Sequence, residues 1–283
     1  MNFFTLRPVQ TMEVSPEPHI LMPWLWWSKP AKPNREPLLL WAQHILPSCK
    51  SELCGTPGYR IDLSGADLRR ADFRRADLRE ANLREANLRG ADLRGAKLRG
   101  ASLHKTTLDS TTKIDKKWRL VWKIVNQRED VRHDWKLPKV DLSGANLVGV
   151  NLRGAILYKS NLREANLSWA NLSWADLREA NLHKSDLSRV NLYKSDLRGA
   201  DLREIDLREI ALRRANLVDA NLVDANLVDA NLVDANLSGV DLRGANVSGA
   251  NLTEVILTGA SYYGIQYDST TIWPEGFIPP SSR

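Results

Sequence analysis

The sequence predicts an all-β solenoid that carries a short α-helical insert. Leucine or a close substitute recurs at every fifth position from residue 63 to 108 and again from 142 to 257. Ala, Ser, Val, Ile or Thr stands two positions before each of them. This period matches neither a strand, which repeats every two residues, nor a helix, which repeats every 3.6. It is typical of a solenoid, in which each unit is buried only by stacking on its neighbours.

Composition sets broad limits on location and partners. Charged residues make up 26% of the 283 residues, and the formal net charge is +6. Such a basic balance attracts phosphate and anionic lipid surfaces in general, without naming a partner. No apolar run approaches the roughly 20 residues that span a bilayer. The N-terminus lacks a clear signal-peptide pattern, so we expect a cytoplasmic location.

Residues 1–58 form a Pro/Trp-rich N-terminal arm, with nine of the 13 prolines and four of the ten tryptophans. Proline fixes φ and lacks an amide donor, so regular structure is unexpected over most of this arm. The exception is the apolar stretch 38–46, a short helix that would cap the first repeats. Cys49 and Cys54 could form a disulfide or half of a metal site. No second pair stands at zinc spacing, so plain thiols are favoured.

The repeats form two blocks. Block 1 covers residues 61–110 and block 2 covers residues 140–269, with an insert at 111–139 and a C-terminal cap and tail at 270–283. The repeats of the two blocks are out of frame, so the insert is a true insertion. Both blocks end in Asp-Ser-Thr-Thr, at 109–112 and 268–271. We interpret this tetrapeptide as an exit signal, whose short polar side chains bond freed backbone groups.

The insert has the apolar spacing of an amphipathic helix. Asp115 is a suitable N-cap residue. Trp118 and Trp122 either pack on the repeats, which we favour, or contact a partner. The residues that share the apolar face are Ile114, Trp118, Val121, Trp122 and Val125.

The repeat unit, for example Ala-Asn-Leu-Arg-Glu at 81–85, resembles the A(D/N)LXX repeat of the pentapeptide-repeat family. The resemblance extends over most of residues 61–269. It implies a right-handed quadrilateral β-helix with four pentads per coil. It also implies that the central leucine and the residue two before it point inward, while the other three positions point outward. We favour one continuous rod over two rods joined by a helical hinge.

Candidate partner contacts lie where the residues at the outward positions differ from those of the other repeats. We name the aromatic edge (Trp169 and Trp174), the basic belt (Lys184, Arg189, Lys194 and Arg198) and the acidic coil (Asp219, Asp224, Asp229 and Asp234). Exposed tryptophan is costly in water and favours a contact role. The charged positions have a plainer explanation as solvated faces with weak ion pairs. The acidic coil, four copies of Asn-Leu-Val-Asp-Ala, has a plain explanation as a duplication.

Three functional hypotheses follow. The leading one is a non-enzymatic scaffold that binds an unknown protein partner. A second comes from the resemblance: the best-understood branch of the family binds DNA gyrase by imitating duplex DNA, with strongly negative surfaces that this basic chain lacks. A third is binding of nucleic acid or an anionic membrane through the Arg-rich faces. Homodimerisation through an open coil end is also compatible with the pattern. No cofactor, metal or catalytic residue is expected, because the carboxylates are spread regularly around the coils.

Overall fold

The computed structural model describes residues 61–127 and 134–280. The chain divides into two compact units, Met1–Asn34 and Arg35–Arg283, and every described residue lies in the second. The predicted arm at 1–58, the predicted helix at 38–46, Cys49 and Cys54 lie outside the described residues. The structure therefore bears on the repeats, the insert and the C-terminal segment.

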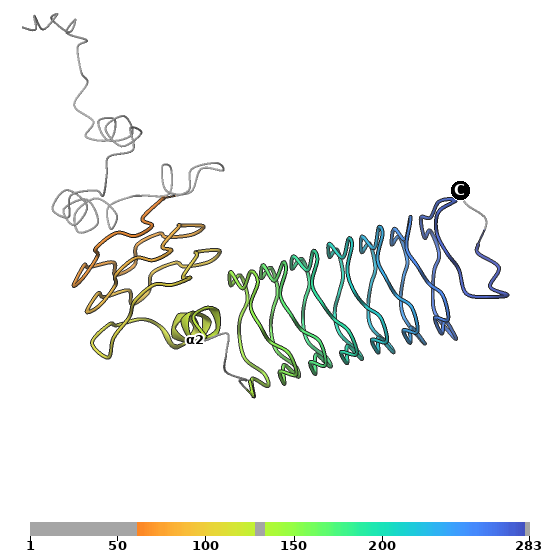
Figure 1. Cartoon of the computed structure of the whole chain (residues 1–283), viewed down its shortest axis with the longest axis horizontal. Helices are drawn as coiled ribbons and strands as arrows, with labels where there is room; N and C mark the ends of the chain where they lie inside the picture. Colours follow the sequence, from red (N-terminus) through yellow and green to blue (C-terminus); the bar gives the residue numbers. More distant parts are fainter. Residues whose placement is uncertain (1–60, 128–133, 281–283) are drawn as a thin grey trace, which may run out of the picture. The chain divides into compact units, whose positions relative to one another are not determined.

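Parallel backbone bridges join residues twenty positions apart in both blocks, such as Asn171 with Asn191 and Asn191 with Ala211. Each pentad supplies one bridge residue, so four pentads make one coil (Figure 1). The Leu172 amide donates to the Asn191 carbonyl at 2.8 Å, and the Asn191 amide donates to the Ala170 carbonyl at 3.1 Å. Each coil satisfies the backbone of its neighbours, and the fold is a β-solenoid.

The pentad at 175–179 shows the five positions of the repeat. Ala175 is the inward flank, Asp176 the bridge position and Leu177 the central position. Arg178 and Glu179 occupy the first and second corner positions, and the Ala180 amide closes the turn on the Leu177 carbonyl at 3.0 Å. Glu179 has a φ of 55°, the positive value that a type II turn places at its second central residue. The chain turns through one corner of the coil at every pentad.

The core is a stack of central leucines flanked by small residues. Leu172, Leu192 and Leu212 lie one coil apart and are at most 1% exposed. Phe73 and Val247 take the central position in two pentads and are equally buried. Larger inward-flank residues are also accommodated; the fully buried ones include Val190, Ile205, Ile210 and Val240.

Block 2 begins one pentad earlier than the sequence indicated. Lys136 bridges to Ile156 in the same twenty-residue register as the rest of the block. Leu137 is buried, and the corner that follows it contains Pro138 and Lys139, the latter with a φ of 59°. The predicted boundary at 140 missed this pentad because Trp135 replaces the small inward-flank residue that marks the others.

The Asp-Ser-Thr-Thr segments are corners that are one residue wider than the others. Asp92 bridges to Lys113 and Asn251 to Ile272, a spacing of 21 rather than 20. The Asp109 carboxylate accepts hydrogen bonds from its own corner and from the Gly90 amide of the neighbouring coil. The chain therefore leaves the coil one strand after this motif rather than at it, and the polar side chains bond the backbone as predicted.

The insert contains helix α2, Lys116–Val125, with Asp115 at the N-cap. The Asp115 side chain makes no bond to the helix; its Oδ2 accepts a hydrogen bond from the Gly95 amide at 3.3 Å instead. Val121 and Ile124 of α2 are buried against the repeats. The N-cap residue thus fastens the start of the helix to block 1.

The two blocks meet at the corner that contains Gly100. The Gly100 amide donates to the Gly144 carbonyl at 2.8 Å. The Asn146 amide group donates to the Gly100 carbonyl at 3.3 Å. Arg99 and Glu164 form an ion pair at 2.6 Å across the same junction. Backbone bonding therefore passes from block 1 to block 2 at this corner.

An aromatic cluster covers the last coil. The rings of Trp273 and Phe277 stack with their centroids 5.0 Å apart, and Tyr262 and Tyr267 meet them edge-on at 5.8 and 5.4 Å. Tyr263 is 69% exposed because it occupies a corner position, and it is not part of this cluster. The cluster that covers the last coil therefore consists of four aromatic residues.

We expect both blocks to unfold in a single cooperative transition in differential scanning calorimetry. Solenoid repeats are coupled through their neighbours, and the Gly100–Gly144 bond and the α2 contacts carry that coupling across the junction. An Arg99→Ala, Glu164→Ala variant, which removes the ion pair but not the backbone bond, should keep the single transition. Two resolved transitions in the wild type, or a scattering profile of two separately moving bodies, would contradict a continuous stack.

Candidate interaction surface

Both tryptophans of the aromatic edge stand at second corner positions, one pentad apart. Trp169 has a φ of 63° and Trp174 a φ of 62°. A left-handed backbone costs an ordinary L-residue about 1–2 kcal/mol, and bulky residues rarely adopt it. Trp169 is 61% exposed and Trp174 is 49% exposed. Neither ring regains that cost by burial in the core.

A cation from the next coil covers one face of each ring. The Arg189 guanidinium lies 4.8 Å from the Trp169 ring centroid, and Lys194 Nζ lies 4.4 Å from that of Trp174. On the preceding coil, the equivalent corner positions are Gly149 and Gly154, where a Cβ would meet no atom within 4 Å. Each indole therefore has a cation on one side and an open glycine corner on the other.

The basic belt carries less free charge than its sequence suggests. Lys184 pairs with Glu204 at 3.0 Å, and Arg189 pairs with Glu209 at 3.2 Å. Arg198 pairs with an aspartate of its own pentad. Lys194 stacks between the rings of Trp174 and Tyr193 instead of meeting a carboxylate of the described chain. The belt is largely neutralised and merges with the aromatic edge at Arg189 and Lys194.

Arginine at a first corner position pairs with aspartate at the bridge position of its own pentad. Arg94 donates to both carboxylate oxygens of Asp92, and this bonding lowers the pKa of Asp92 to about 2. Most of these pairs are solvent-exposed, and such pairs contribute about 0–1 kcal/mol each. Their main effect is to cancel charge at the surface. The other pairs of this kind are Asp67–Arg69, Asp72–Arg74, Asp77–Arg79, Asp176–Arg178, Asp196–Arg198, Asp201–Arg203, Asp206–Arg208 and Asp241–Arg243.

The acidic coil places its aspartates at four successive corners. Asp219, Asp224 and Asp229 lie over glycines of the next coil, whose missing side chains leave room for the carboxylates. Asp234 instead pairs with Arg214 at 3.2 Å. A hydrogen bond shared with Asp234 raises the pKa of Glu254, which occupies the next coil at that corner. These four carboxylates lie at separate corners, so the structure does not gather them into one site.

Trp118 and Trp122 of α2 are partly buried and pack against the repeats. Trp122 Nε1 donates to the Thr106 carbonyl at 2.9 Å, and both rings pack against the core. Lys117, on the polar side of the helix, reaches Asp141 of block 2 at 3.0 Å. The helix therefore uses its aromatic residues to hold the insert in place.

Comparison with known families identifies the repeat. A profile described as pentapeptide repeats, with eight copies, matches within residues 59–95, 76–112, 137–173, 165–204, 205–244 and 220–259. These ranges cover more than half of the chain. The chain belongs to the pentapeptide-repeat family. Pentapeptide-repeat proteins are in general structural and interaction proteins rather than enzymes. A comparison with curated proteins finds no match.

Several solved pentapeptide-repeat structures are similar to this chain. HetL, from the cyanobacterium Nostoc sp. strain PCC 7120, is involved in the regulation of heterocyst differentiation. It is 26% identical, with a TM-score of 0.33, over 81% of this chain and 96% of its own. A trypsin-treated form of QnrB1, a plasmid-mediated fluoroquinolone resistance protein, is 16% identical, with a TM-score of 0.34, over 74% of this chain and 91% of its own. Rfr23, from the cyanobacterium Cyanothece 51142, is 29% identical, with a TM-score of 0.18, over 49% of this chain and 84% of its own.

Two further observations describe this pentapeptide-repeat chain. No helix within residues 61–127 and 134–280 is long and apolar enough to cross a membrane. Across the same ranges, no three His, Cys, Asp or Glu side chains are grouped in a way that could hold a metal ion.

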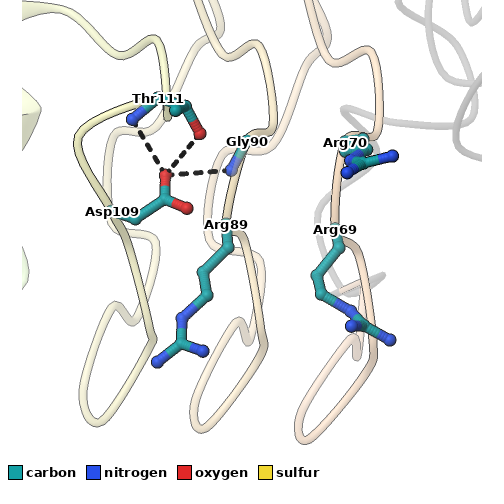
Figure 2. A pocket seen from close by; sticks show the side chains of 6 residues that line it. All are labelled: Arg69, Arg70, Arg89, Gly90, Asp109 and Thr111. Atoms are coloured by element: carbon teal, nitrogen blue, oxygen red, sulfur yellow. Dashed lines mark hydrogen bonds between the residues drawn. The ribbon is translucent and has the colours of Figure 1, made fainter.

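Sequence reasoning missed one feature of this pentapeptide-repeat protein, a pair of arginine-lined clefts on block 1. The first is lined by Arg69, Arg70, Arg89, Gly90, Asp109 and Thr111 (Figure 2). The second is lined by Asp72, Arg74, Arg75 and Arg94. They stand at two successive corners, which we call the arginine corners. The signal was present in the sequence as consecutive arginines at both corner positions, Arg69-Arg70 and Arg74-Arg75.

Proposed function

We propose that this protein is a non-enzymatic scaffold that binds a protein partner through the aromatic edge. The observation that carries the proposal is the placement of Trp169 and Trp174, two exposed indoles at left-handed corner positions. Glycine, which tolerates that backbone, occupies the same positions one coil earlier, at Gly149 and Gly154. The two tryptophans therefore occupy a left-handed position that glycine fills without strain one coil earlier.

The surroundings of the edge suit recognition of a protein. Tryptophan and arginine are the residues most enriched among interface hot spots, and truncating one commonly costs at least about 2 kcal/mol of binding. The cations stacked on Trp169 and Trp174 hold the rings in place before a partner arrives. Preorganisation lowers the entropy cost of association. The open corners at Gly149 and Gly154 leave the second face of each ring accessible to a partner side chain.

The third hypothesis, binding of a polyanion through the basic belt, has less support. Lys184, Arg189 and Arg198 each meet a carboxylate within the chain, which cancels the long-range field that such binding needs. Mimicry of duplex DNA also has less support, because uniform acidic character is limited to the coil at 216–235. The aromatic edge distinguishes this surface from an ordinary charged one.

Replacing both tryptophans with asparagine tests the proposal. Asparagine tolerates a left-handed backbone, so the Trp169→Asn, Trp174→Asn variant should melt at or above the wild-type temperature. Binding of partners captured by crosslinking and affinity purification from native lysate should fall by at least about tenfold, as expected when two hot-spot residues are lost. The measurement is the partner yield together with the melting temperature.

A matched control is Tyr263→Ser, which removes another exposed aromatic side chain at a corner. It should leave the partner yield unchanged. If the double asparagine variant recovers the same partners as the wild type, the aromatic edge is not the binding surface.

A further inference from the structure

Four cations at second corner positions meet a carboxylate one coil further along. Glycine there, with no side chain, removes the counter-charge from the neighbouring cation. Observed pairs of this kind include Lys159–Glu179 at 3.1 Å, Lys184–Glu204 at 3.0 Å, Arg189–Glu209 at 3.2 Å and Arg214–Asp234 at 3.2 Å.

Arg70 and Arg75 have no such carboxylate opposite them. Each stands at a second corner position, with φ of 62° and 60°, and the equivalent positions one coil on are Gly90 and Gly95. A Cβ at Gly90 would lie 3.3 Å from Arg70 Cγ, and one at Gly95 would lie 3.6 Å from Arg75 Cγ. Both arginines therefore pass over a glycine. Neither has an ion pair with a carboxylate within residues 61–127 or 134–280.

Arg89 lacks a partner for a different reason. Its bridge-position residue is Asn87 rather than aspartate, so the bidentate pair seen in the Asp-containing pentads cannot form. The Asn87 side-chain oxygen accepts from the Arg89 amide at 3.3 Å and from the Thr107 hydroxyl at 3.0 Å. The Arg89 guanidinium has no carboxylate partner in the described chain.

The Asp109 carboxylate, which lines this corner, is already committed. Asp109 Oδ1 accepts from the Thr111 hydroxyl at 2.7 Å, the Thr111 amide at 3.0 Å and the Gly90 amide at 3.2 Å. Figure 2 shows the Arg69 and Arg89 side chains running side by side, away from Asp109. The Asp109 carboxylate stabilises its own turn and does not pair with the Arg89 guanidinium.

We propose that the arginine corners bind the terminal phosphoryl groups of a small phosphorylated ligand. Guanidinium groups present paired N–H donors that match phosphate oxygens, and such charge-assisted bonds are among the strongest in proteins. The first corner supplies Arg70 and Arg89, with Arg69 beside them, in a cleft of about 520 Å³. The second supplies Arg75, with the Asp-paired Arg74 and Arg94, in a cleft of about 610 Å³. The phosphoryl group takes the place of the carboxylate that Lys159, Lys184, Arg189 and Arg214 meet.

A small ligand fits better than a nucleic-acid backbone. A phosphodiester chain that followed the first corner along the stack would meet the Asp109 carboxylate on the next coil. At the second corner it would meet Asp115, whose Oδ2 bonds to the Gly95 amide. The basic strip is therefore interrupted by negative charge within one coil. Asp109 also lines the first cleft, but its Oδ1 is held by the Gly90 and Thr111 donors, and a terminal phosphoryl group needs only the arginines of one corner.

Replacing the two glycines with aspartate tests the site without changing an arginine. Gly90→Asp with Gly95→Asp supplies the carboxylates that Arg70 and Arg75 lack. Aspartate tolerates this backbone and occupies it in the acidic coil, for example at Asp224 with a φ of 57°. We titrate the full chain with inorganic pyrophosphate by calorimetry at low salt. The aspartate variant should bind at least about tenfold more weakly than wild type, because an internal counter-ion competes for charge-assisted bonds.

The matched control is Gly90→Asn with Gly95→Asn, which has the same shape without the charge. It should bind pyrophosphate within about twofold of the wild type. A second control, Arg203→Gln with Arg208→Gln, removes two arginines that already pair with aspartate and should also leave binding unchanged. Thermal melting of each variant verifies that it is folded.

Three results would overturn the proposal. One is an absence of pyrophosphate binding by the wild type. Another is equal weakening by the aspartate and asparagine variants, which would mean that shape rather than charge matters. The last concerns a duplex oligonucleotide tested at the same phosphate concentration. If it binds more tightly than pyrophosphate, and if the glycine-to-aspartate variant weakens that binding, the corners belong to a nucleic acid. The aromatic edge is a separate surface, so none of these results affects the proposed scaffold function.

Discussion

Replacing Leu192 with alanine is expected to lower the free energy of unfolding by about 2–5 kcal/mol, measured by chemical denaturation. Leu192 is fully buried and stacks between Leu172 and Leu212 of the adjacent coils. The cost should lie toward the upper part of that range, because surrounding atoms cannot move in to fill the cavity. Hydrogen bonds to both neighbouring coils hold the backbone on each side of the stack, such as that from the Leu192 amide to the Ala211 carbonyl at 2.9 Å.

Val218→Ala is the matched control, since it also shortens an apolar side chain, but at a half-exposed first corner position. Its effect should stay within about 0.5 kcal/mol, as for most surface substitutions. A Leu192→Ala effect no larger than that of Val218→Ala would contradict the rigid stacked core.

Replacing Asp109 with alanine is expected to lower the melting temperature clearly at neutral pH and only slightly near pH 2. Hydrogen bonds, first among them the one from the Thr111 hydroxyl, hold the pKa of Asp109 at about 2, below its ordinary 3.8. Because the folded-state pKa is depressed, the ionised carboxylate stabilises the fold above the ordinary value. That contribution is lost as the pH falls through about 2. Thermal melting of both proteins between pH 7 and pH 2 measures the difference.

Asp62→Ala is the comparison for this experiment. The Asp62 carboxylate accepts one bond from the Ser64 amide and one from the Asn82 side chain, and it holds no wide corner together. Its effect on melting should be smaller at neutral pH. An Asp109→Ala difference that stays constant down to pH 2 would show that the charge of Asp109 does not stabilise the turn.

Much of the fold could be predicted because the five-residue period directly encodes which side chains face inward. Leu68, Leu147 and Leu222 are all fully buried, and so are the substitutes Phe73 and Val247. The two Asp-Ser-Thr-Thr segments could be recognised as paired structural signals because they occur at equivalent places. The geometry of these segments could not be predicted from the sequence. The extra residue in each corner is visible only in the bridge spacing, which changes from 20 to 21.

The candidate surface was harder to predict, because charge at one position depends on residues a whole coil away. The basic belt appears strongly positive in the sequence, yet Lys184 and Arg189 meet Glu204 and Glu209 twenty residues on. Arg70 appears equivalent to them, but it meets Gly90. A count of charges treats these three cations alike, and only the stacking of coils separates the neutralised ones from the accessible one.

The sequence by itself determined the solenoid, the inward and outward positions and the presence of an interruption between two blocks. These follow from local, periodic chemistry, in which a leucine in every pentad must be buried whichever coil it joins. The tertiary structure decided which cations remain unpaired, where backbone bonding crosses from Gly100 to Gly144, and that Trp169 and Trp174 stand at strained corners. Each of these depends on contacts between neighbouring coils or on the sign of φ, and the five-residue pattern specifies neither.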